Sequence, residues 1–219
     1  MKKLLPYGRH LIDDQDINEV SRVLKSDFLT SGPTVEKFEK KFCKYTNAKY
    51  CKVFSSGTAA LHISSIALGL NHTHHVIVPT VTFLASANAF KYTGANIIFC
   101  DIDPETGLMS AEILEETIKK NSDKNIRAVV AVHLNGQPCD LKNIQKVTKK
   151  YNLFLIEDAC HALGAKYLDT KVGDCSFSDL TMFSFHPVKL LAMGEGGVIT
   201  TNSYNISEKL KKLRNHGIE

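Results

Sequence analysis

The chain has 219 residues, of which 43% are hydrophobic and 23% are charged, and its formal net charge is +4 at pH 7. These proportions are ordinary for a globular protein and argue against a disordered tail or a fibre. A small positive charge spread over the whole chain gives no sign of a nucleic-acid or membrane partner. The length predicts one large domain, or one domain and part of a second.

Cysteine spacing and apolar run length favour a cytoplasmic location. The 6 cysteines include no pair at CxxC spacing. No apolar stretch approaches the roughly 18–20 residues of a transmembrane helix. We therefore expect a cytoplasmic protein with free thiols.

Hydrophobic periodicity predicts two opening helices, at residues 13–26 and 35–45, with a break at 29–33. From residue 51 onward short apolar runs alternate with helical stretches. The predicted strands are 51–54, 76–78, 97–102, 126–132, 153–157, 180–185 and 197–201, and the predicted helices are 58–70, 85–92, 111–120, 141–151 and 207–216. This alternation is typical of an α/β fold with a mostly parallel sheet sandwiched by helices, which binds ligands at the carboxyl ends of its strands.

The first two strand ends carry residues that fit a ligand site. Ser56, Gly57 and Thr58 open a helix directly after a strand. Backbone N–H groups at such a helix start bind anions such as phosphate, although an ordinary helix cap explains the same residues equally well. Phe83 follows the next strand, where it stacks on a flat ring or, alternatively, fills the core.

Two later strand ends carry charged groups. Asp158 and His161 follow the apolar strand at 153–157. A carboxylate buried there needs a cationic partner such as a protonated ring nitrogen, and the alternative is a helix cap with a solvated histidine. Lys189 lies between the strand at 180–185 and a glycine-rich turn at 194–197. A desolvated lysine there acts as a nucleophilic amine, whereas an isolated lysine is usually a surface residue.

One cofactor explains a phosphate cradle, an aromatic plate, a carboxylate and a lysine in this order. Pyridoxal phosphate has an aldehyde that bonds to lysine, a ring nitrogen that takes an acidic partner, a ring that stacks and a phosphate. The motifs also resemble those of the DegT/DnrJ/EryC1/StrS sugar aminotransferases, which have the type I aminotransferase fold, and in particular those that act in pseudaminic acid biosynthesis. The motifs are PYGRH at 6–10, FLTSGP at 28–33, SSGTA at 55–59, HLNGQP at 133–138, EDACH at 157–161 and FSFHPVK at 183–189.

The resemblance implies a role for each candidate residue. Lys189 bonds to the cofactor and later moves protons, Asp158 keeps the ring nitrogen protonated, and His161 touches the ring hydroxyl or the ring face. Phe83 stacks on the ring. The residues implied around the phosphate are Ser56, Gly57, Thr58 and Ser184. The implied reaction moves an amino group from glutamate to the 4-keto carbon of a UDP-linked 4-keto-6-deoxy sugar in surface-glycan biosynthesis.

The resemblance also implies an organisation. Residues 1–50 form an N-terminal helical segment that packs on a cofactor-binding large domain, residues 51–219. Family members continue into a small C-terminal domain and build the site across two subunits, so we expect a homodimer or a C-terminal partner fragment. A non-catalytic remnant, or one half of a split enzyme, is the alternative. Residues 190–193 are apolar where the family usually carries hydroxyl groups.

Two other function classes are less well supported. A sugar dehydratase of the same family lacks the lysine, so Lys189 argues against it. A metal protein is the other alternative, since His72, His74 and His75 cluster in one polar stretch. No second cluster at ligand spacing accompanies them, and we expect no metal.

Overall fold

The structure, a computed structural model, describes residues 5, 6 and 8–218. Its main sheet has seven strands in the order β1-β9-β8-β5-β4-β2-β3. These strands are β1 (Tyr50–Phe54), β2 (His75–Pro79), β3 (Asn96–Cys100), β4 (Ile126–Val132), β5 (Phe154–Asp158), β8 (Leu180–Ser184) and β9 (Gly197–Thr201). The helices are α1 (Asp14–Leu24), α2 (Pro33–Thr46), α3 (Gly57–Ala67), α4 (Ala85–Lys91), α5 (Ala111–Lys120), α6 (Leu141–Lys150) and α7 (Tyr204–Arg214), with a 3-10 turn η1 at Leu134–Gly136.

Strand β9 alone runs against its neighbours. It is antiparallel to both β1 and β8, whereas the pairs β5–β8, β4–β5, β2–β4 and β2–β3 are parallel. The prediction of a mostly parallel α/β sheet is therefore confirmed. Because of this arrangement, the carboxyl ends of the parallel strands and the first residue of β9 share one edge of the sheet.

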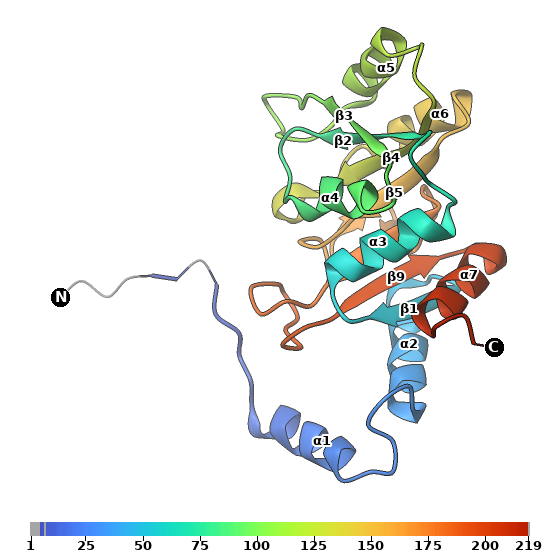
Figure 1. Cartoon of the computed structure of the whole chain (residues 1–219). Coiled ribbons are helices and arrows are strands. Elements are labelled where there is room, and N and C mark those ends of the chain that lie inside the picture. The colour runs from blue at the N-terminus through green and yellow to red at the C-terminus, as the bar shows by residue number, and fades with distance from the viewer. Residues whose placement is uncertain (1–4, 7, 219) are drawn as a thin grey trace.

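Helices cover both faces of the sheet, and the strand side chains alternate between them. Val76 and Val130 belong to a core cluster that includes residues of α3, α4 and α7, whereas Ile77 and Val129 pack with residues of α5 and α6. Figure 1 shows α3 and α4 on the near side of the sheet. Strands that are buried on both faces explain why the sequence reads as short apolar runs rather than as an alternating pattern.

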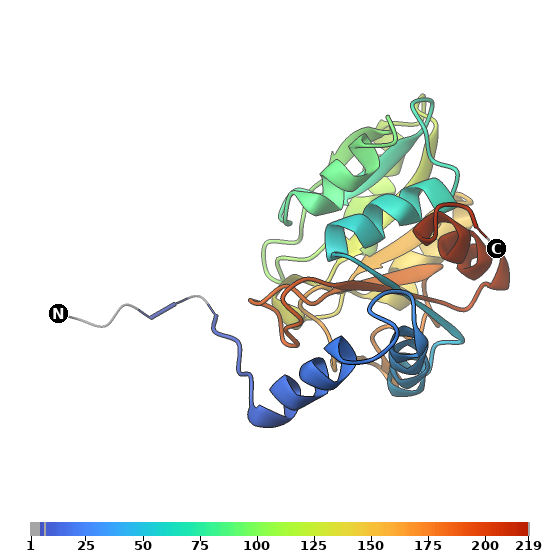
Figure 2. The same cartoon turned by 60° about the horizontal axis from the view of Figure 1, so that its bottom comes forward.

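Helix α2 attaches the N-terminal segment to the sheet through aromatic contacts. The ring of Phe42 lies 5.3 Å from that of Phe183 and 5.9 Å from that of Phe185, between ring centroids. Helix α1 has no buried residue. Figures 1 and 2 show α1 set apart from the sheet and joined to it through α2. The division of the chain at residue 50 stays a prediction.

Two features differ from the sequence-based expectation. A small antiparallel hairpin, β6 (Lys166–Tyr167) and β7 (Thr170–Lys171), has two-residue strands that are too short to give a periodic signal. Helix α7 begins at Tyr204, earlier than predicted, because Ser203 caps it by accepting a hydrogen bond from the N–H of Ile206. None of the helices in the described part of the chain is long and apolar enough to cross a membrane.

Glu39 of α2 joins the two ends of the described fold. Its carboxylate accepts hydrogen bonds from the Val53 N–H at 3.0 Å and from Arg214 of α7, and it lies 3.5 Å from the Lys52 ammonium. The carboxylate side chain is 12% exposed and that of Arg214 is 28% exposed. A carboxylate buried to this degree is stabilised only while these donors surround it.

We expect Glu39→Ala to lower the free energy of unfolding by about 2–4 kcal/mol, because the substitution leaves the Val53 N–H and the Arg214 guanidinium without their acceptor. The matched control is Glu116→Ala, which removes an exposed pair with Lys120 at 3.7 Å and should change stability by less than about 0.5 kcal/mol. Urea denaturation of the full chain measures both. Equal effects of the two substitutions on the free energy of unfolding would contradict the stabilising role of Glu39.

Candidate active site

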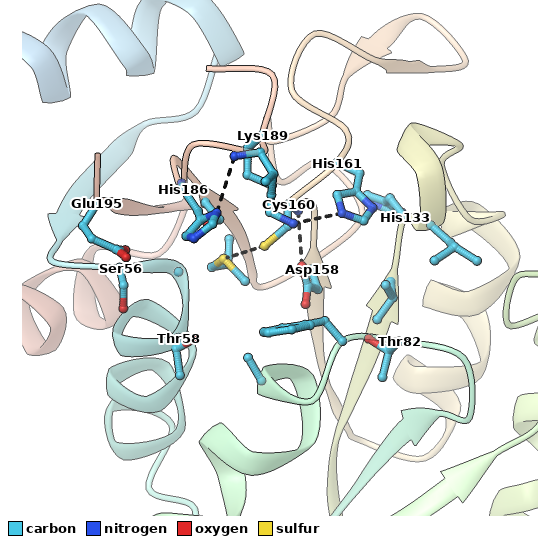
Figure 3. Close-up of a pocket in the computed structure, with 18 residues that line it drawn as sticks. Ser56, Thr58, Thr82, His133, Asp158, Cys160, His161, His186, Lys189 and Glu195 are labelled. Carbon is cyan, nitrogen blue, oxygen red and sulfur yellow. Dashed lines mark hydrogen bonds between the residues drawn. The ribbon is translucent and has the colours of Figure 1, made fainter. Parts of the chain in front are cut away.

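A cavity of about 540 Å³ opens at the edge of the sheet where the parallel strands end. All the site residues predicted from the sequence line it: Ser56, Gly57, Thr58, Phe83, Asp158, His161, Ser184 and Lys189. In Figure 3, Ser56 and Thr58 lie on one side of the cavity, Thr82 and His133 on the other, and Asp158 between them. The lining also includes residues that the sequence reasoning did not single out, among them Thr82, His133, Cys160, His186 and Glu195.

The start of α3 provides backbone donors at one side of the cavity. Ser56 caps the helix, since its Oγ accepts a hydrogen bond from the Ala59 N–H at 3.1 Å. The next N–H, that of Ala60, donates to the Ser56 carbonyl oxygen at 3.0 Å. The N–H groups of Gly57 and Thr58 precede these bonds and lie at the positive end of the helix dipole. The helix cap and the anion site, which the sequence left as alternatives, are thus compatible in one structure.

Two glycines allow the chain to pack closely around this helix start. A Cβ atom on Gly57 would lie 2.8 Å from the Cβ of Ser184, and one on Gly197 would lie 2.3 Å from the Ser56 carbonyl oxygen. Ser184 and Gly197 are also register partners of β8 and β9. Only glycine fits at position 197, because a side chain there would overlap the backbone that carries the Gly57 N–H. The cradle is therefore shaped by backbone atoms, which suits a phosphate group.

Asp158 ends β5 and is 5% exposed. Its Oδ2 accepts a hydrogen bond from the hydroxyl of Ser86 at 2.6 Å, and its Oδ1 accepts one from the Cys160 N–H at 3.2 Å. Each carboxylate oxygen can accept two hydrogen bonds, so the group keeps acceptor capacity in the cavity that it lines. This nearly buried carboxylate, which accepts hydrogen bonds from two protein donors, fits the protonated ring nitrogen of pyridoxal phosphate.

Lys189 lies in the turn after β8, and its Nζ is 2.9 Å from Nε2 of His161. An ammonium group has only donors, so Nε2 of His161 accepts this hydrogen bond and the imidazole proton lies on Nδ1. Burial lowers the pKa of His161, and the charge of Lys189 lowers it further. His161 is therefore neutral near pH 7 and holds the lysine amine at the cavity.

Phe83 is 71% exposed at the rim of the cavity. It lies in the loop between β2 and α4, ahead of the first buried residues of that helix. The alternative that Phe83 fills the core is therefore wrong. Its ring remains free to cover a flat ligand.

The glutamate next to Asp158 belongs to a separate buried network. Glu157 accepts hydrogen bonds from Thr181 at 2.9 Å and from Ser178, and its Oε2 lies 2.8 Å from Nε2 of His133. The Cys139 N–H donates to Nδ1 of His133 at 3.1 Å, so the proton of His133 lies on Nε2 and faces Glu157. This network joins the carboxyl ends of β4 and β5 to the beginning of β8.

His72, His74 and His75 were the alternative metal site that the sequence offered. Within residues 5–6 and 8–218, no group of three or more His, Cys, Asp or Glu side chains could hold a metal ion. His74 instead accepts a hydrogen bond from the Asn71 N–H at 3.2 Å through Nδ1.

A model of the DegT/DnrJ/EryC1/StrS aminotransferase family matches residues 10–219. The chain belongs to this family. The predicted family is thereby confirmed. The motif at residues 6–10 of this chain includes Tyr7, which lies outside the residues that the structure describes.

Two similar proteins carry a nucleotide-linked sugar in their names. The chain is 40% identical over 215 residues to a UDP-4-amino-4,6-dideoxy-N-acetyl-beta-L-altrosamine transaminase of Campylobacter jejuni, covering 98% of this chain and 56% of that protein. It is 38% identical over 217 residues to GDP-perosamine synthase of Escherichia coli O157:H7, covering 99% and 58% respectively. The chain thus spans little more than half the length of these relatives.

Solved structures share the fold. PseC of Helicobacter pylori, an aminotransferase of pseudaminic acid biosynthesis, superposes with a TM-score of 0.89 at 30% identity, covering 99% of this chain and 57% of that one. NtdA of Bacillus subtilis, solved with bound cofactor PMP, the pyridoxamine form of pyridoxal phosphate, superposes with a TM-score of 0.81 at 34% identity, covering 90% and 43%. The predicted link of the family to this cofactor is confirmed.

A measurement of the pKa of His161 tests the contact between this histidine and Lys189. Lys189→Met removes the positive charge but leaves His161 half-buried, so we expect the pKa of His161 to rise while staying below its ordinary value. Lys189→Arg keeps the charge and should keep the pKa low. NMR titration of the imidazole, assigned with His161→Gln, measures the change, and an unaltered pKa in Lys189→Met would exclude the contact.

Proposed function

We propose that this protein holds pyridoxal phosphate on Lys189 and transfers an amino group from glutamate to the 4-keto carbon of a nucleotide-linked 4-keto-6-deoxy sugar. The observation that carries the proposal is the convergence of Lys189, Asp158 and the start of α3 on one cavity. The roles of the individual residues are part of this proposal. When bound, the cofactor supplies an aldehyde and an electron-accepting ring.

Shape and charge give each wall of the cavity a distinct task. The N–H groups of Gly57 and Thr58, with the hydroxyls of Ser56 and Ser184, surround the phosphate. The Asp158 carboxylate, which two protein donors already hold, would accept a third hydrogen bond from the ring nitrogen of the cofactor and would keep that nitrogen protonated. Phe83 covers one face of the ring and excludes water.

Lys189 contributes an amine and carries protons. Its Nζ is held by neutral His161, which accepts one hydrogen bond and leaves other positions on the nitrogen open. With the cofactor bound, the Lys189 amine would hold and move the proton between the carbon of the amino donor and the cofactor, acting as a general base and then as a general acid. His161 limits where the flexible lysine side chain can reach, which favours transfer along one face of the substrate.

The sugar and its nucleotide are proposed from the relatives. Names among them include UDP- and GDP-linked sugars at nearly equal identity to this chain. We favour the UDP-linked substrate of the pseudaminic acid route, because its solved transaminase from Helicobacter pylori covers almost the whole chain at a TM-score of 0.89. On this proposal, the protein acts in the biosynthesis of surface glycans.

Assembly and location are also proposed. We propose that the protein acts as a homodimer or together with a C-terminal partner, as membership of the family suggests. The six cysteines are all free, which agrees with a reducing cytoplasm. A protein that binds the cofactor without catalysing the transfer is the second candidate.

Borohydride reduction after addition of pyridoxal phosphate tests the lysine. We expect the reagent to fix a pyridoxyl group on Lys189, identified by peptide mass spectrometry, because reduction makes the bond between the amine and the cofactor permanent. Lys189→Arg keeps the charge and should abolish this label. Label on another lysine, or label that persists in the variant, would refute the assignment.

Asp158→Asn should slow the half-reaction with glutamate by about a hundredfold to a thousandfold, because the neutral amide cannot stabilise the protonated ring nitrogen when charge develops. Cofactor affinity should fall by only about tenfold. The control is Asp179→Asn, since the Asp179 carboxylate is outside the cavity lining and accepts from the Leu155 N–H at 2.8 Å. A wild-type rate for Asp158→Asn would disprove the pairing. A slow wild type that still traps cofactor would favour the second candidate, which binds the cofactor without catalysing the transfer.

A further inference from the structure

Behind Asp158 lies a chain of two hydroxyl groups from the segment that opens α4. The Ser86 hydroxyl donates to Oδ2 of Asp158 at 2.6 Å, across 72 residues of sequence. Thr82 Oγ1 lies 2.7 Å from Ser86 Oγ. Ser86 is fully buried at 0% exposure, whereas Thr82 lines the cavity.

The chemistry of these groups fixes the direction of the chain. An ionised carboxylate only accepts hydrogen bonds, so the single proton of the Ser86 hydroxyl points to Asp158. Ser86 Oγ is then the acceptor for the Thr82 hydroxyl, which is the donor of the second bond. Both hydroxyl dipoles therefore point toward the carboxylate, and such aligned hydrogen bonds strengthen one another in a buried setting.

We infer that Thr82 and Ser86 form a hydroxyl relay that holds the Asp158 carboxylate in one orientation and stabilises its negative charge opposite the cofactor ring nitrogen. Ser86 and Thr82 are positioning residues in this inference, which rests on the proposed function. At 5% exposure Asp158 receives little help from water, so its charge depends on protein donors. The Cys160 N–H at 3.2 Å is the other such donor.

The relay also explains a local feature of the sequence. Residues 85–89 are a run of small residues at the start of a buried helix, and Ser86 is the hydroxyl-bearing one among them. An alanine at position 86 would pack equally well by size. A hydroxyl there is useful only because it faces a carboxylate on the neighbouring strand.

The test uses the whole protein loaded with pyridoxal phosphate labelled with ¹⁵N in the ring. In the wild type, the ¹⁵N chemical shift should report a protonated ring nitrogen. Ser86→Ala should move the shift toward the unprotonated value and raise the Kd for the cofactor by about tenfold or more, because a hydrogen bond to a charged group is lost. Thr82→Val, which is isosteric, should cause a smaller change in the same direction.

A matched control separates the relay from general loss of a buried hydroxyl. Ser65 is also fully buried, and its Oγ lies 2.9 Å from Thr93 Oγ1, so it forms the same kind of hydroxyl pair away from the cavity. Ser65→Ala should leave the ¹⁵N shift unchanged and the Kd within about twofold of wild type, even if it lowers the stability of the fold.

The outcomes distinguish the inference from the function on which it rests. If Ser86→Ala and Thr82→Val keep the wild-type ¹⁵N shift and Kd, the relay is disproved, while trapping of the cofactor on Lys189 still upholds the proposed function. If the wild-type protein binds no cofactor, both are overturned. Should Ser86→Ala fail to fold, the shift and Kd of Thr82→Val decide the inference.

Discussion

The site depends on a close backbone contact between β9 and the turn that opens α3. A Cβ atom at Gly197 would lie 2.7 Å from the Gly57 backbone nitrogen, so glycine alone permits this approach. The contact fixes both ends of the segment between β8 and β9. Ser184 stays beside Gly57, and the loop at residues 185–196, which contains Lys189, must return to Gly197 at the same place. Because β9 is the single reversed strand, this loop lies at the edge where the parallel strands also deliver their last residues.

Electrostatics then determine what the edge can bind. Strand β5 ends in two adjacent carboxylates, and successive side chains of a strand point to opposite faces of the sheet. Each carboxylate therefore has its own donors: Glu157 is satisfied by His133, Ser178 and Thr181, whereas Asp158 is held by Ser86 and Cys160 and still lines the cavity. Because the two networks are separate, the carboxylate of Asp158 is left as a buried negative charge that can bind a cationic group. Around it in the cavity lie Lys189, the neutral His161 and the start of α3. The same pattern suits a pyridine ring that carries a phosphate.

Much of this architecture can be predicted from the sequence, since apolar runs and the residues after them predict both the parallel sheet and the edge at which Lys189, Asp158 and Gly57 meet.

The features that the sequence does not reveal depend on contacts across the sheet. Ser86 looks like any small helical residue until Asp158 is placed against it, and Gly197 looks like one of several turn glycines. Phe83 has a large apolar side chain of the kind that usually fills a core, but it lies in a loop that leaves it exposed. The hairpin β6–β7 is too short for any periodic signal. The roles of the predicted site residues, and the division at residue 50, remain predictions.

A crystal structure of the protein grown with pyridoxal phosphate tests the central claim most directly. The account predicts continuous electron density from Nζ of Lys189 to the aldehyde carbon of the cofactor, with the ring nitrogen within hydrogen-bond distance of Asp158 and the phosphate at the N–H groups of Gly57 and Thr58. Density that joins the cofactor to a different lysine, or a ring whose nitrogen points away from Asp158, would contradict it.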